Sequence, residues 1–192
     1  MKNSWLKVLV LCASLVVMNI SYADDSNFWN AFKSDNHFVM LRHAIAPGIG
    51  DPSNFELDNC KTQRNLSIEG HDQAKSIGEL FRTNNIENVQ VFSSQWCRCL
   101  ETAQFLDLGD VQPLPLLNSF FQKFEREDSQ TDKLKQWLTK QDLSKPMVLV
   151  THQVNISAIS KVYPSSGELI LLHLSKNGDI TVIDRLQTLR TK

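Results

Sequence analysis

The sequence predicts an α/β protein: a three-layer α/β/α sandwich built on a mostly parallel sheet, with an antiparallel hairpin at its C-terminal edge. Three observations predict this class. Short apolar runs alternate with segments of helical spacing, and the runs are apolar at consecutive positions, as in strands buried on both faces. The last two runs flank Asn177-Gly178, a strong hairpin signal. Hydrophobic residues make up 42% of the 192-residue chain, which is enough for such a core.

The first 23 residues are typical of a secretory signal peptide. Lys2 and Lys7 supply the positive charge, Val8–Met18 is an apolar stretch, and Ser21-Tyr22-Ala23 supplies small residues for cleavage. A membrane anchor is the alternative, but this stretch is too short to span a hydrocarbon core of roughly 30 Å. We therefore expect cleavage after Ala23, one domain over residues 24–192, and a periplasmic or secreted protein without stable membrane insertion.

Strands and helices are expected to alternate along the mature chain. The apolar runs predict strands over His37–Arg42, Val89–Phe92, Met147–Val150, Glu168–Leu174 and Ile180–Leu186. Helical spacing predicts a helix that follows an N-cap at Ser67 and contains Ala74, Ile77, Gly78 and Phe81, and further helices over Arg98–Leu106, Asp132–Lys140 and Val154–Val162. We predict irregular connections where Pro47, Gly48, Gly50 and Pro52 gather, and around Pro113–Pro115, Phe120, Phe121 and Phe124.

The cysteines predict one disulfide bond and one free thiol. Cys12 is removed with the signal peptide, which leaves Cys60, Cys97 and Cys99 in an oxidising compartment. Cys97 and Cys99 are poor partners for each other at their spacing, so the expected bridge joins Cys60 to one of them. Three small buried apolar side chains are the alternative. No CxxC pair or His/Cys cluster has zinc-ligand spacing, so we expect no metal and no cofactor.

The chain has no overall basic surplus, but cations gather at the predicted strand ends. Lys and Arg number 20 against 21 Asp and Glu, so nucleic acid is not an expected partner. Arg42 and His43 end the first strand, Arg98 begins the helix after the second, and His152 follows Met147–Val150. Ligand sites collect beyond the carboxyl ends of parallel strands. Four such groups need an anion among them, and phosphate matches arginine well.

Four segments in order resemble the signatures of the histidine phosphatase superfamily, also called phosphoglycerate-mutase-like. They are Arg42-His43-Ala44, the segment Arg64–Gly70 before the first long helix, Ser93–Arg98 followed by Glu101-Thr102-Ala103, and Val148–His152. The resemblance implies a phosphoric monoester hydrolase with a small phosphorylated substrate. It implies that His43 attacks phosphorus and forms a phosphohistidine, while Arg42, Arg98 and His152 hold the phosphate oxygens.

The proton donor to the leaving group is expected between Arg98 and His152. Relatives use either a glutamate in this interval or an aspartate directly after the second histidine, a position that Gln153 occupies here. The resemblance therefore implies Glu125, with Glu127 and Asp128 as alternatives. A solvated charged loop is the competing interpretation, and an enzyme without this acid should prefer substrates with good leaving groups.

The resemblance also implies a substrate class. Within the family, the small exported phosphatase that acts on lipopolysaccharide core heptose phosphate is similar in architecture, which implies an envelope sugar phosphate. Two other functions stay open: a non-catalytic module that binds phosphate or a phosphosugar in the same pocket, and a structural envelope protein. The sequence leaves the oligomeric state open.

Overall fold

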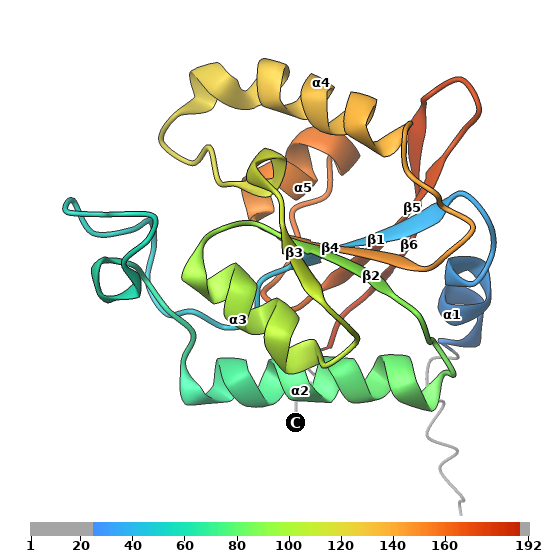
Figure 1. Cartoon of the computed structure of the whole chain (residues 1–192), viewed down its shortest axis with the longest axis horizontal. Coiled ribbons are helices and arrows are strands. Elements are labelled where there is room, and N and C mark those ends of the chain that lie inside the picture. Colours follow the sequence, from blue (N-terminus) through green and yellow to red (C-terminus); the bar gives the residue numbers. More distant parts are fainter. Residues whose placement is uncertain (1–24, 189–192) are drawn as a thin grey trace, which may run out of the picture.

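The computed structural model describes residues 25–188, so the predicted signal peptide lies outside the described residues. Six strands form one sheet in the order β3-β2-β4-β1-β5-β6 (Figure 1). Strands β1 to β4 are parallel, whereas β5 pairs antiparallel with β1 and β6 pairs antiparallel with β5. This confirms the predicted fold class and the C-terminal hairpin. The strands are β1 His37–Arg42, β2 Gln90–Ser93, β3 Val111–Pro113, β4 Met147–Thr151, β5 Leu169–Leu174 and β6 Ile180–Leu186.

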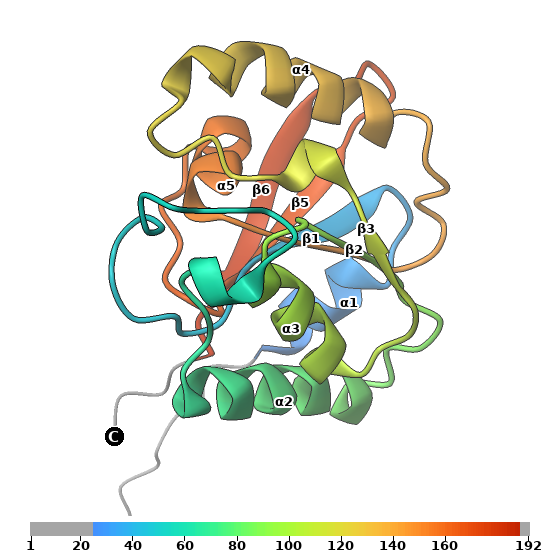
Figure 2. The same ribbon diagram turned by 60° about the vertical axis from the view of Figure 1, so that its left-hand side comes forward.

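Helices cover both faces of the sheet (Figures 1 and 2). One face carries α1 Ser26–Phe32, α2 Ile68–Thr83 and α3 Cys97–Leu106, and the other carries α4 Glu127–Leu138 and α5 Gln153–Ser160. No helix within residues 25–188 is both long and apolar enough to cross a membrane.

The side chains of alternate residues in each strand pack on opposite faces of the sheet. In β1, Val39 and Leu41 belong to the core cluster under α1, α2 and α3, whereas Phe38 and Met40 belong to the cluster under α4 and α5. Side chains alternate in direction along a strand, so a strand covered on both sides needs apolar residues at every position. This explains the continuous apolar runs in the sequence.

Three elements differ from the sequence predictions. The region around Pro113–Pro115, predicted to be irregular, contributes strand β3, because its pairing with β2 is a long-range contact that local pattern does not carry. The sequence pattern does not predict α1, which is too short to show a helical period. Helix α4 begins at Glu127 rather than Asp132, because carboxylates in its first turn favour the positive end of the helix.

The longest connection in the described part of the chain joins β1 to α2 over residues 43–67, which we call the β1–α2 loop (teal in Figure 2). It contains one short 3-10 turn, η1 Cys60–Thr62. A disulfide bond joins Cys60 to Cys97 at the start of α3, with Cα atoms 5.7 Å apart, and Cys99 is a buried free thiol. The expected single bridge from Cys60 is confirmed, and it fastens the loop beside the helix that carries Arg98.

Candidate active site

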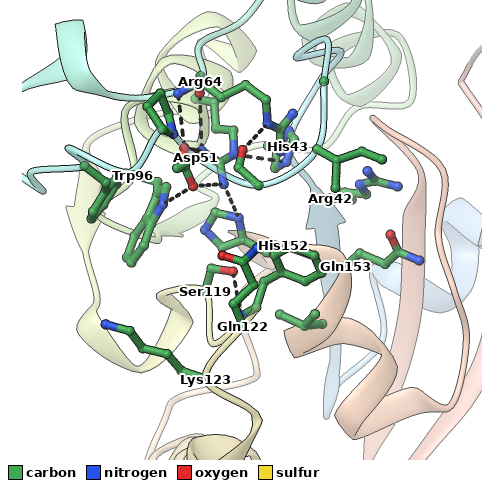
Figure 3. A pocket seen from close by; sticks show the side chains of 18 of the residues that line it. Arg42, His43, Asp51, Arg64, Trp96, Ser119, Gln122, Lys123, His152 and Gln153 are labelled. Atoms are coloured by element: carbon green, nitrogen blue, oxygen red, sulfur yellow. Dashed lines mark hydrogen bonds and ion pairs between the residues drawn. The ribbon is translucent and has the colours of Figure 1, made fainter.

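The structure brings four of the predicted side chains together at the carboxyl end of the parallel strands. Arg42 ends β1 and His43 follows it, His152 lies between β4 and α5, and Arg98 is in the first turn of α3. The rings of His43 and His152 are steeply inclined to each other, with centroids 5.6 Å apart. All but Arg42 are buried, and Figure 3 shows the two histidines facing one pocket.

The guanidinium of Arg98 contacts both imidazoles through one edge. Its Nε lies 3.3 Å from Nε2 of His43, and its Nη2 lies 3.4 Å from Nδ1 of His152. The opposite edge faces Asp51, with Nη1 at 2.7 Å and Nη2 at 3.1 Å from the two carboxylate oxygens. Nη1 also donates to the backbone oxygen of Arg64 at 3.2 Å. These five contacts account for all five N–H groups of a guanidinium.

The hydrogen bonds around each imidazole indicate which ring nitrogen carries the proton. Nδ1 of His43 lies 2.8 Å from the carbonyl oxygen of Ala44, which can only accept. Nδ1 therefore carries the proton and Nε2 keeps its lone pair. Nε2 of His152 lies 2.9 Å from the hydroxyl of Ser94, which donates to Asn118, so Nε2 carries the proton and Nδ1 keeps its lone pair. Both imidazoles are neutral in this arrangement.

Burial and positive neighbours favour these neutral imidazoles. Burial is the larger cause that holds the pKa of both His43 and His152 well below its usual range, and the charge of Arg98 adds to it. Burial and Arg98 also lower the pKa of Arg42, and they lower the pKa of Arg64 to about 10. A histidine nucleophile must be unprotonated, which is the state that this environment favours.

The four side chains line a pocket of about 580 Å³. Arg42 also lines the pocket: its Nη1 donates to the carbonyl oxygen of Pro164 at 2.8 Å, and its Nε is buried without a hydrogen-bond partner within residues 25–188. Several guanidinium groups line this one pocket, so an anion is favoured there. No group of three or more His, Cys, Asp or Glu in that part of the chain is placed to hold a metal ion. The cationic lining residues are Arg42, Arg64, Arg98, Lys123 and Arg126.

Asp51 is a site residue that sequence analysis does not reveal. It is the only carboxylate among the described residues that line the pocket. Besides its two contacts with Arg98, it accepts hydrogen bonds from Nε1 of Trp96 and from the backbone N–H of Arg64, both at 3.1 Å. Burial alone would raise the pKa of Asp51, but Arg98 and these other donors together lower it below its usual value. Its only sequence signal is a single acid in an otherwise uncharged stretch, residues 44–55.

The structure does not bring the predicted proton donor to the pocket. Glu125 is exposed on the short turn η3, Phe124–Arg126, and does not line the pocket, although Lys123 and Arg126 beside it do. Glu127 and Asp128 lie in the first turn of α4 and are also outside the lining. A tight turn sends successive side chains in directions about 120° apart, so position in the sequence does not tell which of them enters a pocket.

Three solved structures show the same fold as this chain. The protein histidine phosphatase SixA, solved with tungstate, gives a TM-score of 0.57 at 13% identity over 79% of this chain and 97% of that chain. Phosphoserine phosphatase from Entamoeba histolytica, in complex with 3-phosphoglyceric acid, gives 0.55 at 14% identity over 79% and 96%. Mycobacterial glucosyl-3-phosphoglycerate phosphatase gives 0.52 at 20% identity over 75% and 92%.

The three structural similarities establish the fold of this chain. This fold agrees with the one implied by the sequence resemblance. No protein-family model and no curated protein matches the sequence itself. The site geometry must therefore carry the argument about activity.

Proposed function

We propose that this chain, whose fold is that of the histidine phosphatase superfamily, hydrolyses phosphate monoesters through a phosphohistidine intermediate. One observation carries the proposal: the unprotonated Nε2 of His43 faces a cationic pocket, beside Arg98 and His152. An imidazole lone pair beside the positive charges of Arg98 and Arg42 is suited to attack on a bound phosphate dianion.

In the first step, Nε2 of His43 attacks phosphorus as the ester oxygen leaves, so that an N–P bond forms and a P–O bond breaks. The Nδ1–H of His43 stays hydrogen-bonded to Ala44, which stabilises the positive charge that the ring acquires. The phosphate oxygens take over the two N–H groups of Arg98 that face the imidazoles, and the positive charge of Arg42 lies beside them. Fixed donors around the transferred group lower the barrier most effectively.

In the second step, water attacks phosphorus and the N–P bond breaks, which returns the lone pair to Nε2 and releases inorganic phosphate. The leaving alkoxide of the first step needs a proton. Glu125, Glu127 and Asp128 stay proposed donors, and each would need a movement of segment 124–128 to reach the pocket. The lowered pKa of Asp51 keeps it charged, so it is a poor donor at neutral pH.

We place the natural substrate among sugar phosphates of the cell envelope and the protein in the periplasm or outside the cell. The signal-like sequence and the Cys60–Cys97 bridge support export, because such bridges persist in oxidising compartments. The pocket volume of about 580 Å³ leaves room for a sugar ring beside the phosphate. Trp96, which stacks on Phe55 with ring centroids 5.0 Å apart, provides an aromatic wall for it.

The test is hydrolysis of an aryl phosphate by the wild-type protein and by His43→Ala. We expect turnover only in the wild type, and mass spectrometry after a rapid alkaline denaturing quench should find phosphate on the peptide that contains His43. Turnover by His43→Ala, or phosphate on another residue, would refute the mechanism.

The alternative function is a binding module that holds phosphate or a phosphosugar without turnover. The observation that favours it is that no carboxylate among the described pocket-lining residues is free to protonate a leaving group. Tight binding of inorganic phosphate by a wild-type protein that hydrolyses no aryl phosphate would establish the module.

A further inference from the structure

We infer that Asp51 is a positioning residue: its carboxylate holds the Arg98 guanidinium in the rotation that turns two N–H groups toward His43 and His152. This inference rests on the proposed function, because it assigns Asp51 a part in the same site. It concerns a residue of the β1–α2 loop, outside the motifs that the sequence resemblance is built on.

The contacts of Arg98 divide cleanly between its two edges. Three of its five N–H groups are held from one side, two by the carboxylate of Asp51 and one by the backbone oxygen of Arg64. The other two, on Nε and Nη2, contact the imidazole nitrogens of His43 and His152 at 3.3 and 3.4 Å, at the edge of the pocket. A two-point contact with a carboxylate fixes the plane and rotation of a guanidinium, which a single contact does not.

Asp51 has no free capacity to contact a substrate itself. One carboxylate oxygen accepts from the backbone N–H of Arg64 and from Nη1 of Arg98, and the other accepts from Nε1 of Trp96 and from Nη2 of Arg98. A carboxylate offers about four lone-pair positions, and four donors occupy them. Asp51 therefore acts through Arg98.

The Asp51 carboxylate is held on a rigid support. Figure 3 shows it between Arg64 and Trp96. Trp96 stacks on Phe55 of the same loop, and the loop is joined to the start of α3 by the Cys60–Cys97 bridge, so both partners of the Asp51–Arg98 pair belong to one fastened unit. Catalytic side chains must be positioned to within about half an ångström, which requires that the residues contacting them are themselves held rigidly.

Charge predicts a separation between binding and catalysis. The Asp51 carboxylate cancels one positive charge in a pocket that also holds Arg42 and Arg64. Without this carboxylate the pocket is more cationic and should still attract a phosphate dianion. The N–H groups of Arg98, however, are no longer held in the orientation that directs them at the phosphate oxygens. Removing the Asp51 carboxylate should therefore lower kcat and leave the affinity for phosphate unchanged. If the carboxylate merely blocked the phosphate position, its removal would instead raise both activity and phosphate affinity.

The first arm of the test compares Asp51→Asn with Asp58→Asn, which removes an exposed acid from the same loop. For Asp51→Asn we expect kcat with an aryl phosphate to fall about 10- to 100-fold, as misplacement of a catalytic group does, with the inhibition constant of inorganic phosphate within about threefold of wild type. Asp58→Asn should match wild type, and Asp51→Glu should recover part of kcat. Faster turnover, or equal losses of kcat and phosphate affinity at unchanged folding, would overturn the inference.

The second arm does not depend on turnover. It therefore tests the role of Asp51 even when the protein shows no phosphatase activity. Heteronuclear NMR of the arginine Nε–H groups can follow Arg98, whose signal is assigned by its loss in Arg98→Lys. We expect slow exchange of the Arg98 Nε–H with solvent in the wild type and in Asp58→Asn, and exchange at least about tenfold faster in Asp51→Asn, because the restrained guanidinium is released. Equal protection in Asp51→Asn would overturn the positioning role.

Discussion

The Nε–H of Arg98 points at Nε2 of His43 across 3.3 Å, and an N–H of the same guanidinium points at Nδ1 of His152 across 3.4 Å. A guanidinium N–H can only donate, so each contact exists only while the imidazole nitrogen is unprotonated and can accept. Protonation of either histidine would set two buried donors against each other. The site therefore couples the charge of both histidines to the stability of the fold.

We predict that the free energy of unfolding falls as the pH drops below the pKa of an unfolded histidine, about 6.5. The folded-state pKa of both His43 and His152 is well below that value, so the unfolded chain binds protons first. The stabilisation is fully present above about pH 6.5 and is lost toward the folded-state pKa, by at most about 1.4 kcal/mol per pH unit for each histidine. Urea unfolding at a series of pH values measures the slope.

The double variant His43→Gln/His152→Gln tests whether these two side chains cause the slope. It should flatten the loss of stability between about pH 7 and pH 5. His173→Gln, which changes a histidine on β5 outside the pocket, is the control variant. An unchanged slope in the double variant would contradict the prediction.

We predict a strong dependence of hydrolysis on the leaving group. General acid catalysis typically contributes about 10²- to 10⁴-fold, so without a donor in the pocket kcat/KM for an aryl phosphate should exceed that for an alkyl phosphate of similar size at least about 100-fold. Glu125→Gln should leave this ratio within about twofold if Glu125 stays outside the pocket during turnover, as it is in the structure. Loss of alkyl but not aryl phosphate hydrolysis in Glu125→Gln would instead establish Glu125 as the acid.

The parts of the site that the sequence predicts are those attached to regular elements. Arg42 is the last residue of one apolar strand, and His43 and His152 directly follow apolar strands. Arg98 lies in the first turn of a helix, so the parallel topology brings all four to one edge of the sheet. Glu125 and Asp51 lie on irregular segments, where side-chain direction depends on turns and long-range contacts.

In the fold, too, features set by local interactions are predicted from the sequence, and features set by long-range contacts are not. Ser67 is predicted as an N-cap, and its hydroxyl accepts from the backbone N–H of Gly70 at 3.1 Å, because capping is a local interaction. Strand β3 is missed, because it exists only through its pairing with β2. Local signals therefore predict the elements that frame the site, whereas contacts between distant segments determine how the site is completed.

We predict that loss of the Cys60–Cys97 bridge lowers both stability and activity. The bridge closes a loop with a sequence separation of 37 residues, and its removal should cost about 2–4 kcal/mol of unfolding free energy. It should also lower kcat/KM, because Cys97 precedes Arg98 and the bridge fastens the loop that carries Asp51. Cys60→Ser and Cys97→Ser should behave alike, and reductant should affect the wild type but neither variant. Full activity in both variants would contradict the prediction for kcat/KM.

Two glycines in α2 allow the effect of close packing on stability to be distinguished from its effect on the position of His43. A Cβ on Gly70 would overlap the carbonyl oxygen of Ile45, two residues after His43, and a Cβ on Gly78 would overlap the carbonyl oxygen of Leu106, at the far end of α3 from Arg98. Backbone atoms cannot yield as a flexible side chain does, so Gly70→Ala and Gly78→Ala should each destabilise the protein by about 1–3 kcal/mol.

Only Gly70→Ala should also lower kcat/KM, because a shift of Ile45 displaces His43, whereas a shift of Leu106 leaves the first turn of α3 in place. Urea unfolding measures the first effect, and aryl phosphate hydrolysis at a temperature where both variants are folded measures the second. Equal losses of activity in the two variants would mean that the close contact of Gly70 with Ile45 has no part in holding His43.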